Sequence, residues 1–294
     1  MPRLTAEELA ERRLGMGSTD VVEACGFAPW QGAGPMRLYC EKRGITSADD
    51  AQEVDEDRAA HLEWGHTMEP VILAWYERTY GVSCVPGGHV TSRDEPWLWA
   101  SLDATVFGQG RILEIKNVSS PALYRHWDVS SQDGIPSYVR AQVTVAMFCH
   151  GAREADVVAC IGGRPPHVWR VSYDAELARL LVEGALRFWA MTVAGTPPPL
   201  DATDASRAYL LSRYPVDVRP TLASTPEVDD LAERRAEQAG DEKRAAAEKR
   251  RLDALLMAAV GDAQGVEGTW GKFTWKCGKD GTRRTRFTGR DAEE

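Results

Sequence analysis

Apolar residues along the first 200 positions follow two spacings, one typical of helices and one typical of strands. Residues 64–81, "WGHTMEPVILAWYERTYG", repeat apolar side chains at helical spacing and end at a glycine. Residues 135–151 and 174–195 follow the same pattern. We expect Thr67 to cap the first of these helices and Pro70 to lie in its first turn. Shorter helices are predicted near the start of the chain, over residues 4–15, 17–27 and 34–45.

β-rich runs lie between these helices. Residues 89–107 and 111–118 are separated by the turn signal Gly108-Gln109-Gly110, which predicts a hairpin. Two further strands are predicted, at 155–163 and 167–174. Strands that alternate with helices indicate an α/β or α+β fold, with a central mixed β-sheet flanked by helices.

The run "TPPPLD" near residue 200 marks a predicted domain boundary, with one domain at 1–200 and a second part at 201–294. The second part is predicted to hold a short helix at 204–213, a charge-dense helical arm at 226–260 with Gly240 as its weak point, and a β-hairpin turning at Asp280-Gly281. No internal repeat is apparent in the sequence.

Composition narrows the class of protein. No apolar run reaches the ~18 residues of a membrane span, and the charged N-terminus is unlike a signal peptide, so we expect a cytoplasmic protein without membrane contact. Six cysteines are present without a CxxC pair, which argues against zinc ribbons and iron–sulfur clusters. We interpret the cysteines as small buried apolar residues.

The net charge of −9 argues weakly against a protein that coats nucleic acid through its overall field. A local basic cluster remains compatible with this charge. The C-terminal hairpin carries such a cluster, which either tracks phosphates or is a solvated charged tail, at Lys276, Lys279, Arg283, Arg284 and Arg286.

Candidate chemistry gathers on the first hairpin, "SLDATVFGQGRILEIKN". Its turn brings Asp103 roughly opposite Glu114, and alternation puts Glu114 and Lys116 on one face of the strand. Two close carboxylates repel unless a cation lies between them, and oxygen ligands select Mg²⁺, with Mn²⁺ as a substitute. Lys116 would then orient or deprotonate a water, or stabilise charge on a phosphoryl oxygen. The alternative is an ion pair on an exposed hairpin.

Two helical residues extend this set. Gln142 lies on the apolar stripe of its helix, where a buried amide needs partners. Its alternative is a core glutamine bonded to backbone. Glu69 shares a helix face with Ile72 and Tyr76, and its alternative is a glutamate favoured by the helix dipole.

The order of these motifs resembles the YqaJ-type viral recombinases, which are related to the phage lambda exonuclease within the PD-(D/E)xK nuclease superfamily. The resemblance runs from about residue 12 to 150, and its motifs are specific only together. They are, in order, Arg13 with "GMGSTD", "LYCEKRG", "WGHTMEP", "SLDAT", "LEIK" and "YVRAQV". Thr19 stands where the family has serine, although Ser18 is an alternative hydroxyl. Beyond about residue 200 the resemblance weakens.

The resemblance implies a PD-(D/E)xK restriction-endonuclease-like core and roles for single residues. Asp103, Glu114 and the carbonyl of Ile115 would hold Mg²⁺, with Glu69 direct or through water. Lys116 would activate the attacking water, and Gln142 would orient Lys116 or a phosphate. The residues implied for the 5′-phosphate or neighbouring DNA are Arg13, Ser18, Thr19, Ser101 and Arg140.

The implied function is a Mg²⁺-dependent exonuclease of a phage or prophage. It would degrade one strand of linear double-stranded DNA from 5′ to 3′ and leave 3′ overhangs for recombination. The partners suggested are DNA ends, a phage single-strand annealing protein and further copies in a ring. The alternatives are a Cas4-like or restriction-type nuclease, or a catalytically silent nuclease-derived DNA-binding module. The missing cysteine cluster disfavours the Cas4-like alternative, and intact Asp103, Glu114 and Lys116 disfavour the silent one.

Overall fold

The computed structural model describes residues 12–30, 32–45 and 56–289. It divides into two compact units, Met1–Val216 (unit 1) and Asp217–Glu294 (unit 2). The helix predicted at 4–15 falls mostly outside the described residues. The predicted domain boundary at residue 200 stays a prediction, since compactness alone places the limit of unit 1 after Val216.

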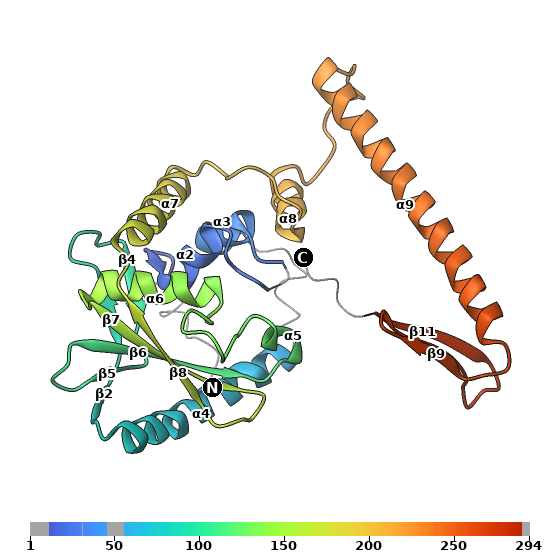
Figure 1. The fold of residues 1–294 in the computed structure, drawn as a ribbon. Helices are drawn as coiled ribbons and strands as arrows, with labels where there is room; N and C mark the ends of the chain where they lie inside the picture. Colours follow the sequence, from blue (N-terminus) through green and yellow to red (C-terminus); the bar gives the residue numbers. More distant parts are fainter. Residues whose placement is uncertain (1–11, 31, 46–55, 290–294) are drawn as a thin grey trace. The chain divides into compact units, whose positions relative to one another are not determined.

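Unit 1 is built on a five-stranded mixed sheet of order β2-β5-β6-β7-β8 (Figure 1). The central pair, β6 and β7, is parallel, and the other neighbours are antiparallel. The strands are β2 (Cys84–Pro86), β5 (Ala104–Val106), β6 (Arg111–Val118), β7 (Glu154–Ile161) and β8 (His167–Ser172). This arrangement confirms the predicted α/β class with a central mixed sheet flanked by helices.

Helices cover both faces of this sheet, because β6 and β7 are apolar on both sides. On one face α4 (Glu56–Tyr80) packs Ile72 and Tyr76 against Leu113 and Ile115. On the other face α6 (Ser137–His150) packs a row of buried valines, and α7 (Ala175–Ala194) lies against α6. The remaining helices of unit 1 are α2 (Ser18–Ala24), α3 (Pro35–Arg43), α5 (Pro121–Tyr124) and α8 (Asp204–Arg213).

The first predicted helix of the site differs from the structure at its start. The helix begins at Glu56, so Thr67 and Pro70 lie in its interior. The Thr67 hydroxyl donates to the Glu63 carbonyl, 2.9 Å away, and does not cap the helix. Alanine and charged residues of high helix propensity precede the predicted start and extend the helix backwards.

A second, small sheet of order β1-β4-β3 carries the N-terminal motif. Its strands are β1 (Met16–Gly17), β3 (His89–Thr91) and β4 (Leu98–Ser101). β1 runs parallel to β4, with Met16 opposite Leu98 and Gly17 opposite Trp99. Gly17 lies against the Trp99 ring, where an added Cβ would come within 2.9 Å. Because α2 begins directly after Gly17, its first turn lies beside the end of β4. β4 ends at Ser101, two residues before Asp103.

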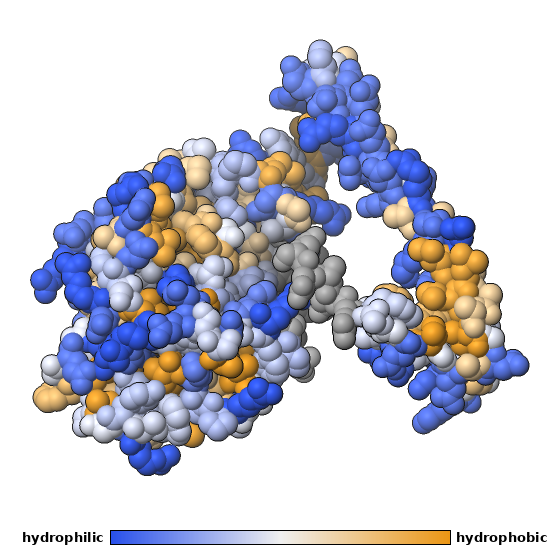
Figure 2. Space-filling model, viewed as in Figure 1, coloured by the Kyte–Doolittle hydropathy of each residue, from blue (hydrophilic) through white to orange (hydrophobic). Residues whose placement is uncertain are grey.

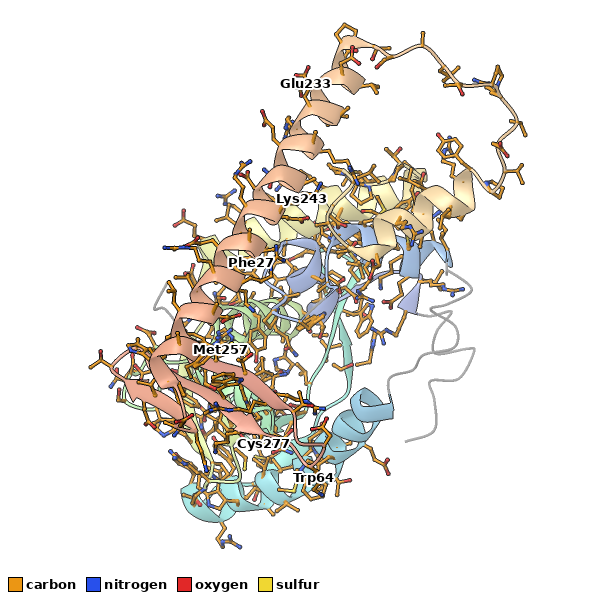
Figure 3. All side chains as sticks on the ribbon, turned by 90° about the vertical axis from the view of Figure 1, so that its right-hand side faces the viewer. Phe27, Trp64, Glu233, Lys243, Met257 and Cys277 are labelled. Carbon is orange, nitrogen blue, oxygen red and sulfur yellow. The ribbon has the colours of Figure 1, made fainter. Side chains whose placement is uncertain are left out.

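Unit 2 consists of α9 (Pro226–Val260) and a three-stranded sheet of order β11-β10-β9. The helix passes through Gly240 without a break, and Glu233 and Lys243 project from it (Figure 3). Hydrophobic residues gather towards its C-terminal end, where Leu252 and Leu255 are exposed (Figure 2). The hairpin predicted at Asp280-Gly281 is confirmed as the antiparallel pair β10–β11, while β9 was not predicted. The strands are β9 (Gly265–Gly268), β10 (Gly271–Cys277) and β11 (Arg283–Gly289).

The cysteine interpretation holds only in part. Cys40, Cys149 and Cys160 are buried, whereas Cys25 and Cys84 are half-buried and Cys277 is exposed. Over the described residues, no helix is both long enough and apolar enough to cross a membrane.

Candidate active site

The β5–β6 hairpin forms at the predicted turn and fixes the position of Asp103. The single strand predicted over residues 89–107 is wrong, because the structure divides it into β3, β4 and β5. Gly108 and Gly110 both adopt positive φ in its turn, at 72° and 62°. Ala104 lies opposite Leu113, so Asp103 stands just ahead of β5, beside Glu114 and Ile115. Its Oδ2 accepts the Ile115 backbone N–H at 2.6 Å. Asp103 is thereby tied to the strand that carries the other candidate residues.

Glu114, Lys116 and Gln142 form a closed triangle of polar contacts. Alternation along β6 turns Glu114 and Lys116 towards α6, which carries Gln142. Lys116 Nζ donates to Glu114 Oε1 at 2.6 Å and to Gln142 Oε1 at 3.1 Å. Gln142 Nε2 donates to Glu114 Oε1 at 2.8 Å. The Gln142 amide is therefore bonded to two side chains and is not a core glutamine bonded to backbone. Its role in orienting Lys116 or a phosphate stays a prediction.

The electrostatics of the cluster follow from its burial. The Glu114 side chain is 5% exposed and that of Lys116 is 26% exposed. Burial, followed by repulsion from the Glu114 carboxylate, raises the pKa of Asp103 to about 8. Burial acts to lower the pKa of Lys116, but the Glu114 carboxylate outweighs it and raises that pKa above its ordinary value. Two carboxylates thus compete for one ammonium group.

The oxygen atoms of Asp103, Glu114 and Ile115 suit a hard divalent cation that keeps several of its waters. They do not form a cage that surrounds the ion with protein ligands. Among the described residues, no group of three or more His, Cys, Asp and Glu side chains could hold a metal ion. Two carboxylates are, however, the usual protein contribution to Mg²⁺, which keeps several waters. N–H and C=O of one strand residue point to the same side, so the Ile115 carbonyl lies on the side of Asp103. A cation there would offset the repulsion that raises the pKa of Asp103.

Glu69 lies at the margin of this cluster. Its carboxylate is close enough to contribute to the raised pKa of Asp103. Its nearest polar partner is His66 on the same helix, with Nδ1 and Oε1 3.2 Å apart, and its side chain is 39% exposed. Across the described part of the chain, no hydrogen bond or ion pair joins Glu69 to the Glu114–Lys116–Gln142 triangle. Its place in a metal site stays a prediction.

The predicted phosphate-binding residues come from two neighbouring segments. Ser18 and Thr19 begin α2, and Ser101 ends β4, which is paired with β1. Thr19, Ser101 and Arg13 are exposed, whereas Ser18 is buried. Exposure makes Thr19 rather than Ser18 the hydroxyl available to a ligand. The Arg13 guanidinium lies over Gly44, where an added Cβ would be 3.3 Å from Nη1.

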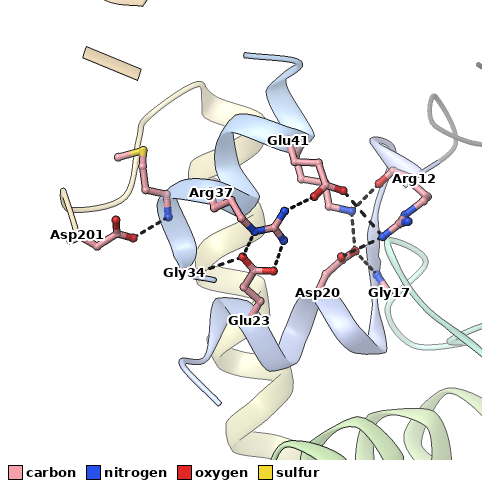
Figure 4. A network of polar contacts seen from close by, with 10 residues as sticks. Arg12, Gly17, Asp20, Glu23, Gly34, Arg37, Glu41 and Asp201 are labelled. Atoms are coloured by element: carbon pink, nitrogen blue, oxygen red, sulfur yellow. Dashed lines mark hydrogen bonds and ion pairs between the residues drawn. The ribbon is translucent and has the colours of Figure 1, made fainter. Parts of the chain in front are cut away.

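A buried polar network holds this N-terminal segment in place (Figure 4). Lys42 Nζ donates to Asp20 Oδ2 and to the Arg12 carbonyl, each at 2.6 Å. Asp20 Oδ2 also accepts the Gly17 N–H at 2.8 Å, which closes the start of α2. Asp20 is therefore occupied by Lys42 and Gly17. The other carboxylate oxygen of Asp20, Oδ1, lies 3.8 Å from Arg12 Nη2.

Arg140 differs from the other predicted DNA-binding residues. Its Nη2 forms an ion pair with Asp133 at 3.2 Å, and its side chain is half-buried. Asp133 is exposed, so this pair competes with water and contributes little stability. Phosphate contact by Arg140 stays a prediction.

A cavity of about 560 Å³ lies on the same face of the sheet, and sequence reasoning missed it. Ala159 of β7 lies beside Lys116, and His167 of β8 lies beside Ala159. Both line the cavity with Tyr124, Trp127 and Arg164. Aromatic rings and a guanidinium group suit stacking and phosphate contact. The alternation in "HVWRVS" was an available signal, because it places His167 and Trp169 on one face of the strand. Their ring centres lie 4.2 Å apart with the planes tilted by 57°.

Comparisons with known proteins address the family and the fold. Residues 9–153 match the model of the YqaJ-like viral recombinase domain. Two crystal structures of LHK-Exo, an alkaline exonuclease from Laribacter hongkongensis, one of them in complex with dAMP, are similar to this chain. Each is 20% identical with a TM-score of 0.50, over 71% of this chain and 97% of that one.

A phage-related exonuclease from Haemophilus somnus is 10% identical with a TM-score of 0.42, over 62% of this chain and 96% of that one. No curated protein matches the chain. The likeness to LHK-Exo supports the fold, and the match over 9–153 spans every predicted site residue, from Arg13 to Gln142.

Proposed function

Because residues 9–153 belong to the YqaJ-like viral recombinase family, we propose that this protein is a metal-dependent exonuclease that hydrolyses one strand of linear double-stranded DNA. The observation that carries the proposal is the convergence of Asp103, Glu114 and Lys116. Asp103 is bonded to the backbone of the β6 strand, and Glu114 holds Lys116 at 2.6 Å. Two acids and one amine in this arrangement suit phosphodiester hydrolysis.

The metal in this proposal is Mg²⁺, with Mn²⁺ as a substitute. Asp103, Glu114 and the carbonyl of Ile115 would hold it, with Glu69 as an outer contact. When bound, such a cation would neutralise charge on the phosphate and lower the pKa of a coordinated water. Gln142 fixes Lys116 Nζ by a hydrogen bond at 3.1 Å. Lys116 would transfer a proton at Nζ or stabilise the negative charge that develops on the phosphate.

We assign end recognition to the N-terminal segment beside β4. The exposed Arg13, Thr19 and Ser101 would bind the terminal 5′-phosphate or the next phosphates, with Ser18 and Arg140 in supporting positions. Degradation would then run from 5′ to 3′ and leave 3′ overhangs. The aromatic-lined cavity next to Lys116 supports a nucleic acid substrate, since its rings can stack on a base. An annealing protein and a ring of identical subunits stay predictions.

The first experiment uses linear and covalently closed circular duplex DNA with Mg²⁺, Mn²⁺ or EDTA. We expect the linear form alone to be degraded, and only with metal. Asp103→Asn and Glu114→Gln should lose activity by roughly 10²-fold or more, while Glu183→Gln, an exposed glutamate of α7, keeps it. Thermal unfolding should show that all variants fold. If Asp103→Asn and Glu114→Gln both kept full activity, this cluster would be excluded as the active site.

The same assay separates the alternatives. A restriction-type nuclease would cut the closed circle, and a silent module would bind DNA without cutting it, whichever metal is present.

The polarity of degradation is measured on duplexes labelled at either end, with and without a 5′-phosphate. Arg13→Gln should remove the preference for phosphorylated ends, whereas Arg179→Gln on exposed α7 should keep it. An unchanged preference in the Arg13 variant would remove Arg13 from end recognition.

A further inference from the structure

The sheet of unit 2 has two chemically different faces. In the register of β10 and β11, Lys272 lies opposite Thr288, Thr274 opposite Arg286, and Lys276 opposite Arg284. Residues paired across an antiparallel ladder point to the same side. One face, here called the cationic face, therefore carries Lys272, Thr274, Lys276, Arg284, Arg286 and Thr288. The opposite face carries Phe273, Trp275, Arg283 and Phe287.

Part of the opposite face packs within unit 2, whereas Phe287 is exposed and stacks on Trp270. Phe273 is fully buried. The Arg283 guanidinium lies 3.7 Å from the centre of the Trp275 ring and donates to the carbonyls of Gly261 at 2.8 Å and Ala263 at 2.5 Å. Arg283 thus clamps the turn after α9 to the sheet. It was counted among the basic cluster from the sequence, and the structure removes it from that cluster.

The cationic face concentrates charge that the fold does not need. Lys276 lies directly opposite Arg284, an arrangement that destabilises a sheet when both residues are charged. Glu267 pairs with Lys272 at 2.6 Å, and Asp280 pairs with Arg284 at 2.5 Å. Lys276 and Arg286 are exposed, and no ion pair involves either of them among the described residues.

The sheet of unit 2 has a positive net charge, whereas the whole chain is negative. Residues 265–289 hold six Lys and Arg against two Asp and Glu, while the chain has a net charge of −9. A positive face within an acidic protein points to a specific anionic partner.

We propose that the cationic face binds the phosphate backbone of double-stranded DNA. Lysine, arginine and threonine side chains are the usual donors to phosphate oxygens. Single-strand binders place aromatic rings among their cations so that bases can stack, and here the rings lie on the opposite face. The cationic face therefore suits a duplex, which presents phosphates and keeps its bases stacked inside. This binding site lies outside residues 9–153 and does not depend on hydrolysis.

The test is DNA binding by the full chain in EDTA, so that the proposed nuclease activity does not enter. The probe is a fluorescent dumbbell duplex closed at both ends, which offers no terminus to unit 1. Dissociation constants are measured by anisotropy over a range of KCl concentrations. Lys276→Gln/Arg286→Gln should weaken binding at every salt concentration. Each lost phosphate contact should also lower the salt-dependence slope by about 0.9.

The matched control removes two positive charges elsewhere in unit 2. Arg234→Gln/Arg244→Gln changes exposed arginines of α9 that pair with Asp230 and Asp241, and it should leave affinity and slope unchanged. Thermal unfolding checks the fold, and relief of like charges should leave the Lys276/Arg286 variant at least as stable as the parent. Affinity and slope equal to the parent would overturn the proposal. The proposal would also be overturned if the Lys276/Arg286 variant lost more affinity for a single-stranded probe than for the duplex. Binding of polyglutamate by the parent protein without binding of DNA would overturn it as well.

Discussion

Lys116 makes two contacts that have different consequences. Burial acts to lower its pKa and the Glu114 carboxylate raises it, while the hydrogen bond to Gln142 helps to hold the amine in position. Glu114 thus acts on both the charge and the position of Lys116, and Gln142 acts on its position. A variant at each position can separate them.

We expect Lys116→Met to lose turnover by roughly 10²-fold or more, the scale of acid–base catalysis. DNA affinity should change little, because one phosphate contact among many carries a small share. Gln142→Ala should lose less, since the Glu114 carboxylate still holds the amine. Single-turnover rates and dissociation constants on a linear duplex measure both effects, with exposed Lys249→Met as control. Equal losses in rate and affinity would reduce Lys116 to a phosphate contact.

At the scale of elements, α2 and α3 are held together by a buried ion pair. The side chains of Lys42 and Asp20 are 1% and 6% exposed. Removing Lys42 leaves the buried Asp20 carboxylate with only the Gly17 N–H and a looser ion pair to Arg12 at 3.8 Å, whereas removing both charges is far less harmful. The segment that carries Arg13 and Thr19 depends on this joint for its position beside β4.

Lys42→Met should therefore lower the free energy of unfolding by roughly 3–5 kcal/mol. Lys42→Met/Asp20→Asn should recover part of the loss, because an amide oxygen still accepts the Gly17 N–H. Urea unfolding gives both values. The exposed pair Lys249–Asp253 is the comparison, where Lys249→Met should cost less than about 1 kcal/mol. If Lys42→Met lowered the free energy of unfolding by as little as Lys249→Met, the Lys42–Asp20 pair would not be what holds α2 and α3 together.

At the scale of the whole molecule, residues 214–225 join the two units without helix or strand, and all of them are exposed. Unit 1 has its own core on both faces of the sheet. We expect residues 1–216 to unfold cooperatively and to keep hydrolysis of linear duplex if the proposed function holds. Calorimetry and the end-labelled assay measure this. A truncated chain without a cooperative transition would show that unit 1 needs unit 2.

The sequence predicted what local periodicity controls. The hairpin at residues 108–110 and the helix of Gln142 followed from alternation and helical spacing, and they brought Asp103, Glu114, Lys116 and Gln142 together. Contacts set by strand order were out of reach. His167 lies near Lys116 only because β7 and β8 follow β6 across the sheet. Lys42 was missed because lysine is rarely buried and its partner is 22 residues away.

Of the six thiols in this chain, only that of Cys277 is exposed, at the end of β10 (Figure 3). In a protein stored without reductant, an exposed free thiol is the one that oxidises and couples two molecules through a disulfide. Such a covalent dimer would carry two cationic faces and would bind DNA bivalently, with an avidity that a single chain lacks. A Cys277→Ser background avoids this artefact, because the side chain points away from the cationic face.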